Sequence, residues 1–147
     1  AVLTQMLAVH DQYQGSVLAV EKINPAQSSS YGIVAGTLTS PGVHRLTGIV
    51  EKPLPKDAPS NLAVVGRYVL SSNIFNYIRN LQPGAGGELQ LTDAIAALLK
   101  AEPVFAYEYQ GVRYDCGSKL GYLKATVDFA LRHPEVSSDF AAFLKQR

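Results

Sequence analysis

The segment from Leu62 to Leu70, LAVVGRYVL, constrains the fold of this chain more than any other stretch. Its apolar residues run almost without interruption, which is typical of a strand that is covered on both faces. Gly66 interrupts the run, and a glycine inside a strand indicates that another backbone or a ligand comes close. The sequence therefore predicts a buried strand here, in contact with a further part of the molecule.

Further strand patterns surround this segment. The short apolar run at residues 16–20 predicts a buried strand. Residues 31–38 and 43–50 flank Pro41-Gly42, a pair typical of turns, and predict a hairpin. Residues 104–109 and 112–115 predict two short strands around Gln110-Gly111. Residues 24–30, NPAQSSS, are all turn formers and predict a loop.

Helical spacing appears between these strands. Apolar residues at a period near 3.6 predict a first helix over residues 3–13 and a short amphipathic tail over 140–146. Three more helices are expected to begin at side-chain caps, namely Ser72, Thr92 and Ser118. The mixture of strands and helices predicts an α/β or α+β fold whose mixed sheet is covered by helices.

Composition restricts the class of protein. A length of 147 residues suits one domain, and the single cysteine, Cys116, favours a reducing compartment such as the cytoplasm. A net charge of +1 gives no basic face for nucleic acid, and no apolar run approaches the ~20 residues of a membrane span. The sequence has neither a signal-peptide pattern nor an initiator Met, which indicates Met removal or a piece of a longer protein.

Two adjacent opposite charges, Glu51 and Lys52, stand at the end of the predicted hairpin and precede Pro53. Proline forces the chain out of the sheet, and this bend can turn both side chains toward one cleft. The carboxylate can then accept hydrogen bonds from sugar hydroxyls, while the ammonium can meet a phosphate. The alternative is an exposed strand end with a solvated ion pair, and the spacing alone leaves both interpretations open.

Asp115 follows a predicted strand and precedes Gly117 and a helix, which is where α/β proteins place ligand groups. Its carboxylate could bind Mg²⁺, which needs only one or two protein carboxylates beside phosphate oxygens and waters. The alternative is a carboxylate that caps the following helix. Cys116 is expected to be a small buried apolar residue rather than a nucleophile.

The glycine-rich segment at residues 83–87, PGAGG, resembles a phosphate-binding loop only in composition. It lacks the lysine and hydroxyl residue of a P-loop and the spacing of a dinucleotide-binding loop, so a structural turn is favoured. The three histidines, His10, His44 and His133, lie far apart and have no metal-ligand spacing.

Four segments in this order resemble the bacterial UTP–glucose-1-phosphate uridylyltransferases, which are sugar nucleotidyltransferases. They are VEKP (50–53), PSNLAVVGRYVLS (59–71), GELQLTDAI (87–95) and DCGSKLGYLKA (115–125), and Tyr31-Gly32 fits as well. The resemblance implies a nucleotide-diphospho-sugar transferase fold, which is Rossmann-like. It also implies the formation of UDP-glucose and pyrophosphate from UTP and glucose 1-phosphate, with Mg²⁺.

The same resemblance assigns roles to single residues. Glu51 is expected to accept hydrogen bonds from glucose, and Lys52 to neutralise the sugar phosphate as the catalytic cation. Gly32 and Gly66 are expected to leave room for the sugar, and Asp115 to be one of two carboxylates that hold Mg²⁺. A homo-oligomer in the cytoplasm is the corresponding expectation for assembly and location.

The family also begins with a glycine-rich nucleotide-binding loop and a first metal-binding aspartate, and neither pattern occurs in this sequence. Residues 1–147 are therefore expected to be the C-terminal, sugar-binding portion of one domain and to be inactive alone. Three alternatives stay open: a thymidylyl- or other nucleotidyltransferase, a regulatory paralogue that binds but does not catalyse, and an interaction module. The last would pack its helices at 72–81 and 120–132 and its tail at 139–146 against another subunit.

Overall fold

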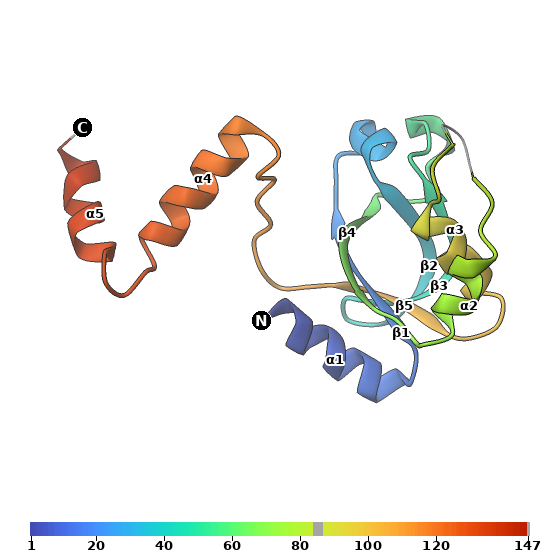
Figure 1. Cartoon of the computed structure of the whole chain (residues 1–147). Helices are drawn as coiled ribbons and strands as arrows, with labels where there is room; N and C mark the ends of the chain where they lie inside the picture. Colours follow the sequence, from blue (N-terminus) through green and yellow to red (C-terminus); the bar gives the residue numbers. More distant parts are fainter. Residues whose placement is uncertain (84–86, 147) are drawn as a thin grey trace. The chain divides into compact units, whose positions relative to one another are not determined.

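The computed structural model describes residues 1–83 and 87–146, which form two compact units, Ala1–Gln110 and Gly111–Arg147. Figure 1 shows the first unit as strands with short helices and the second as two helices. None of the helices in the described ranges is long and apolar enough to cross a lipid bilayer.

The first unit is built on a mixed sheet that closes on itself in the order β1-β4-β2-β3-β5. Strand β1 pairs in parallel with β5, whereas the other neighbouring pairs are antiparallel. The predicted mixed sheet is thus confirmed, and so is the predicted hairpin, formed by β2 and β3 (Figure 1). The strands are β1 (Ser16–Lys22), β2 (Gly32–Ser40), β3 (Val43–Glu51), β4 (Leu62–Val69) and β5 (Val104–Glu108).

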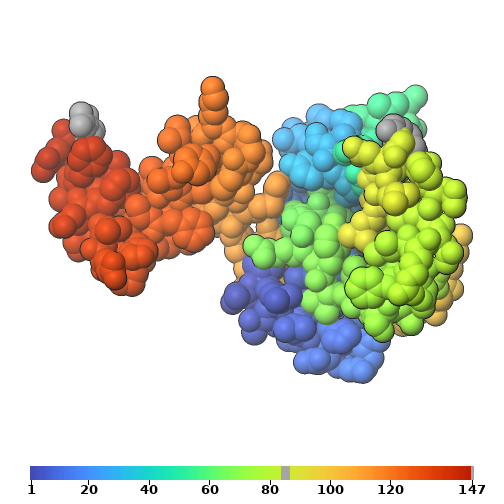
Figure 2. Space-filling model, in the orientation of Figure 1, coloured from blue at the N-terminus to red at the C-terminus, as the bar shows by residue number. Residues whose placement is uncertain are grey.

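Helices cover this sheet from more than one side. Helix α1 (Val2–Tyr13) contacts β1 and β4, while α3 (Leu91–Leu98) packs on β3 and against α2 (Ile74–Arg79). In the space-filling view, α2 and α3 form one continuous yellow-green surface (Figure 2). Two short 3₁₀ helices, η1 (Pro25–Ser30) and η2 (Pro55–Asp57), lie against each other.

Strand β1 shows why the core has two parts. Successive side chains of a strand point to opposite faces. Val17 and Ala19 accordingly join Met6 of α1 in one buried cluster, while Leu18 and Val20 join a larger cluster with the helices α2 and α3. All four β1 side chains are buried, so this strand is covered on both faces, as its continuous apolar run predicts.

Strand β4 forms where it is predicted, but its burial is different from the prediction. Leu62, Ala63 and Val64 are buried, whereas Gly66 and Arg67 are exposed. The expectation of two covered faces is therefore correct only for the first three residues. The physical reason is an irregularity in the pairing with β1 between Val64 and Tyr68, the stretch that contains Gly66 and Arg67.

Other local predictions need correction. Residues 112–115 form no strand, because they belong to the second unit, whose described residues contain no strand to pair with them. Residues 25–30 are not an open loop but the helix η1, which Asn24 caps by accepting from the Ala26 amide at 3.1 Å. Ser72 and Thr92 cap nothing with their side chains, since α2 and α3 begin at Ile74 and Leu91.

Ser16, at the start of β1, is one of the buried polar residues of the first unit. Its hydroxyl donates to Glu102 at 3.2 Å and accepts from the Ser71 amide at 3.0 Å. Burial alone raises the pKa of Glu102, but hydrogen bonds from Ser71, Asn73 and Ser16 outweigh it and lower the pKa below its ordinary value. This network joins β1 to the segments that follow β4 and α3.

The second unit contains α4 (Lys119–Ala130) and α5 (Ser137–Lys145), and the predicted cap at Ser118 is confirmed. Its hydroxyl accepts from the Gly121 amide at 3.0 Å. Ala125 is buried in α4, and α5 has no buried residue. Many large apolar side chains of this unit are exposed, including Leu120, Tyr122, Leu123, Phe129, Leu131, Val136, Phe143 and Leu144.

Candidate functional site

The hairpin of β2 and β3 brings Glu51 opposite Gly32 in the sheet register. The chain then turns away: the Lys52 amide donates to the Tyr31 carbonyl at 3.0 Å, and Pro53 follows. Antiparallel pairing thus places two predicted site residues, nineteen positions apart in the sequence, at one end of the sheet. The turn after Glu51 puts Lys52 beside them.

The carboxylate of Glu51 is fixed rather than free in solvent. Its Oε2 accepts a hydrogen bond from the Thr92 hydroxyl at 2.5 Å, and its Oε1 lies 3.8 Å from the Lys52 ammonium. A Cβ added to Gly32 would lie 3.2 Å from Oε2, closer than ordinary contacts. The absence of a side chain at Gly32 therefore leaves the space that the Glu51 carboxylate occupies.

A pocket of about 220 Å³ opens beside this carboxylate. Gly66 lines it in a left-handed conformation, φ +77°, and a Cβ built there would meet nothing within 4 Å. Its φ favours glycine, whereas the space around it would accept a side chain. The lining residues are Ser30, Tyr31, Gly32, Ile49, Glu51, Val64, Gly66, Tyr68, Thr92 and Ile95.

Tyr68 and Thr92 belong to this pocket, although the sequence reasoning assigned neither to the site. Burial raises the pKa of the Tyr68 phenol, and the negative charge of Glu51 raises it further. Tyr68 is therefore a neutral hydrogen-bonding group at neutral pH. Thr92 stood out in the sequence as a hydroxyl residue at the start of a predicted helix. That hydroxyl was interpreted there as a helix cap rather than as a donor to a site residue.

A second pocket of about 520 Å³ is also lined by Glu51 and includes Lys52 in its wall. Its lining residues are Ile49, Val50, Glu51, Lys52, Glu88, Gln90 and Asp93. The Lys52 side chain is 56% exposed, so its ammonium is accessible from solvent. Glu51 is common to the two pockets, which places an acceptor for hydroxyl groups next to a cation for an anionic group.

Asp115 lies in the second unit, so the structure does not group it with Glu51 and Lys52. Its side chain is exposed, and Oδ1 accepts from the Gly117 amide at 3.2 Å, which makes an Asx turn before α4. Gly121 is required beside this turn, because a Cβ there would lie 1.9 Å from the Asp115 carbonyl oxygen. Within the described ranges, no group of three or more His, Cys, Asp or Glu side chains is placed to hold a metal ion.

Cys116 is exposed, so the prediction of a buried apolar cysteine is wrong; the turn that Asp115 forms leaves its neighbour outside any core. The predicted turn at residues 83–87 cannot be assessed in full, because residues 84–86 lie outside the described ranges.

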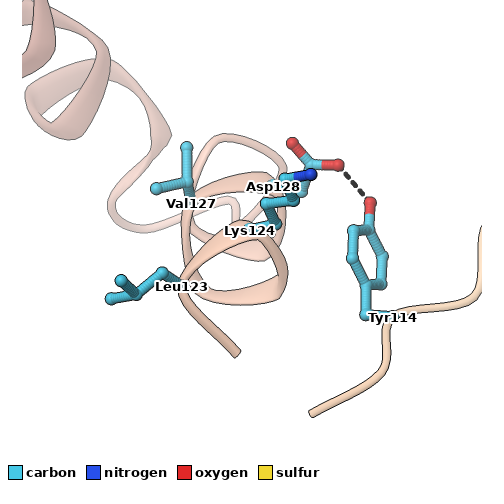
Figure 3. A pocket seen from close by; sticks show the side chains of 5 residues that line it. All are labelled: Tyr114, Leu123, Lys124, Val127 and Asp128. Atoms are coloured by element: carbon cyan, nitrogen blue, oxygen red, sulfur yellow. Dashed lines mark hydrogen bonds between the residues drawn. The ribbon is translucent and has the colours of Figure 1, made fainter. Parts of the chain in front are cut away.

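The second unit has a pocket of its own, of about 390 Å³, lined by Tyr114 and by Leu123, Lys124, Val127 and Asp128 of α4. Figure 3 shows the Tyr114 hydroxyl directed at the Asp128 carboxylate, to which it donates a hydrogen bond. This hydrogen bond raises the pKa of the tyrosine. None of the predicted site residues lines this pocket, which is mostly apolar.

Comparison with known proteins decides the family. The family model for nucleotidyl transferases matches residues 1–131. The chain belongs to the nucleotidyl transferase family. The fold agrees: a UDP-glucose pyrophosphorylase crystallised with UDP-glucose superposes with a TM-score of 0.84 at 40% identity, over 90% of this chain and 50% of the other. The α/β fold with a mixed sheet is thereby confirmed.

Two curated members of the nucleotidyl transferase family are similar to most of this chain. The UTP–glucose-1-phosphate uridylyltransferase of Pseudomonas aeruginosa is 45% identical over 132 residues, which are 90% of this chain and 47% of that protein. The enzyme of the same name from Staphylococcus epidermidis is 41% identical over 144 residues, 98% of this chain and 50% of that protein. The chain thus spans about half the length of the relatives it matches.

Proposed function

We propose that this chain supplies the sugar-phosphate site of a UTP–glucose-1-phosphate uridylyltransferase, which forms UDP-glucose and pyrophosphate from UTP and glucose 1-phosphate. The observation that carries the proposal is the 45% and 41% identity to two proteins of that name, over 90% and 98% of this chain. The arrangement of Glu51 between a pocket with polar walls and a pocket with a lysine supports it.

Each site residue has a task in this reaction. Glu51 accepts hydrogen bonds from glucose hydroxyls, Gly32 leaves room for its carboxylate, and the open space at Gly66 admits the ring. Lys52 neutralises the phosphate of the sugar, whose oxygen attacks the α-phosphorus of UTP as pyrophosphate departs. Because this chemistry consists mostly of positioning and charge neutralisation, an exposed ammonium next to a fixed carboxylate suits it.

Mg²⁺ is the cofactor we propose, and Asp115 is the residue of this chain that would hold it. One exposed carboxylate fits an ion that takes one or two protein carboxylates and fills its remaining positions with phosphate oxygens and waters. When bound, such an ion neutralises charge on the phosphates. The exposed apolar residues of α4 and α5 fit the proposal that the enzyme is a homo-oligomer, and the single cysteine fits a cytoplasmic location.

A thymidylyltransferase is the less supported alternative. A Bacillus anthracis protein described as a candidate glucose-1-phosphate thymidylyltransferase superposes with a TM-score of 0.63 at 26% identity, and both values are well below those for the UDP-glucose pyrophosphorylase. The proposal that UTP rather than dTTP is the nucleotide substrate rests on sequence similarity alone. A comparison of UTP with dTTP as nucleotide donor would distinguish the two.

The test of the proposal is calorimetric titration of the 147-residue chain with glucose 1-phosphate. We expect glucose 1-phosphate to bind at least about tenfold more tightly than glucose or inorganic phosphate, because each of these smaller ligands fills only one of the two pockets. With UTP and Mg²⁺ added, we expect no pyrophosphate release from this chain alone. Equal affinity for glucose 1-phosphate and for inorganic phosphate would contradict the proposed sugar site.

Replacing Thr92 by valine tests how far Glu51 depends on its fixed position. Valine keeps the shape but removes the hydroxyl that donates to Glu51. We expect a three- to tenfold loss of affinity for glucose 1-phosphate, which corresponds to the roughly 0.5–1.5 kcal/mol of a typical hydrogen bond. Thr92→Ser keeps the hydroxyl and is expected to bind as the wild type does. If the valine and serine variants bind equally well, the hydroxyl has no such role.

A further inference from the structure

Lys52 has a backbone conformation that its own sequence disfavours. Its φ is +46°, in the left-handed region that side chains other than glycine rarely adopt. It also precedes Pro53, and a residue before proline is driven toward extended conformations. Such a conformation persists only where the surrounding structure holds it in place. The groups that hold the Lys52 backbone therefore also help to determine the position of its ammonium group.

The end of η1 and the residue that follows it, Tyr31, supply these groups on both sides of Lys52. Before it, the Tyr31 carbonyl accepts from the Lys52 amide at 3.0 Å. After it, the Ser28 hydroxyl donates to the Pro53 carbonyl at 2.9 Å. The Ser28 carbonyl accepts from the Tyr31 amide at 3.1 Å, so Ser28 and Tyr31 belong to one hydrogen-bonded turn.

Burial gives the Ser28 hydroxyl its importance. Ser28 is 0% exposed, and Pro53 is buried as well. A buried carbonyl that loses its donor cannot turn to solvent without moving the peptide that contains it. Ser28 fixes the peptide that follows Pro53, one residue beyond Lys52. Because the proline ring restricts rotation about its own N–Cα bond, a movement of that peptide is passed back to Lys52, which then relaxes toward extended backbone and swings its side chain.

We propose that Ser28 is a positioning residue for glucose 1-phosphate binding, which acts by clamping the Lys52–Pro53 segment so that the Lys52 ammonium faces the second pocket. The part of this proposal that concerns glucose 1-phosphate rests on the proposed function. The part that concerns the backbone of Lys52 rests on the contacts of Ser28 alone. Ser28 touches neither pocket: it lines neither of them, so it acts through Lys52.

The first test reads the clamp without any ligand. A left-handed residue gives a strong nuclear Overhauser effect between its own Hα and amide proton, and an extended residue gives a weak one. In Ser28→Ala we expect this signal of Lys52 to weaken and its amide to exchange faster with solvent. Ser28→Cys, which keeps the size but has a weak donor, covers the case that the alanine variant does not fold. Ser16→Ala is the matched control, a buried serine distant in sequence from Lys52.

The second test measures the affinity for glucose 1-phosphate. We expect Ser28→Ala and Ser28→Cys to weaken glucose 1-phosphate binding about three- to tenfold, and we expect this loss to vanish in a Lys52→Ala background. Ser16→Ala should lower the melting temperature but leave both readouts unchanged. An unchanged Lys52 signal in both Ser28 variants, or an affinity loss that persists without Lys52, would overturn the proposal. If the wild-type chain does not bind glucose 1-phosphate, the proposed function fails and so does the ligand role, while the Lys52 signal still decides the clamp.

Discussion

Lys52→Ala is expected to reduce the affinity for glucose 1-phosphate about 10- to 100-fold. The reason is that an ammonium bonded to phosphate contributes a charge-assisted hydrogen bond, and such bonds are worth about 1.5–3 kcal/mol. Lys52 is the lysine of the second pocket, and the other charged residues there, Glu51, Glu88 and Asp93, repel an anion. Calorimetric titration measures the loss directly.

Lys56→Ala is the matched control for this change. Lys56 lies four residues later in η2 and is exposed, but it does not line the pocket. Its removal changes the net charge by the same amount, so a general electrostatic effect would appear in both variants. We expect less than a twofold change for Lys56→Ala. Comparable losses in the two variants would contradict a specific role for Lys52.

Leu98→Ala is expected to destabilise the first unit by about 2–5 kcal/mol, the range for a large buried residue reduced to alanine. Leu98 is 0% exposed and lies at the end of α3, in the cluster that contains Leu18 and Val20 of β1. Deletion leaves a cavity between helix and sheet that close packing cannot fill. Urea unfolding followed on the amide resonances of β1 reports on this unit separately from the helices α4 and α5.

Leu38→Ala removes the same atoms from an exposed site and serves as the comparison. Leu38 is on β2 with 62% of its surface exposed, so we expect a change within about 0.5 kcal/mol. Since α3 also carries Thr92, the Leu98 variant is expected to weaken sugar-phosphate binding as well. A cost below about 1 kcal/mol for Leu98→Ala would show that the core relaxes into the cavity.

The sequence predicted most elements of the fold because their signals are local. The apolar run of β1 and the turn at Pro41-Gly42 are patterns that tertiary structure reinforced. Strand β4 was predicted correctly in place but not in burial, because the register shift at Gly66 depends on its pairing with β1. The predicted strand at 112–115 is wrong for a related reason, since a strand also depends on its pairing partner. No partner strand lies beside these residues in the described part of the second unit.

The part of the candidate site that consists of residues adjacent in the sequence was predictable. Glu51, Lys52 and Pro53 are consecutive, so their shared turn follows from the sequence. Thr92 was missed because its role depends on α3 packing against β3, a contact between positions 41 residues apart. A hydroxyl near a predicted helix start has two possible uses, as a cap or as a donor to a distant group, and only the folded chain distinguishes them.

The narrow space at Gly32 links the evolution of separate positions. Glu51 reaches Thr92 across the place where a side chain at residue 32 would stand. A mutation of Gly32 to a larger residue must therefore displace the acid, and a shorter acid at 51 would lose its hydroxyl partner. Substitution at one of these three positions is expected to be tolerated only after a change at another, so among related enzymes they should vary together or not at all.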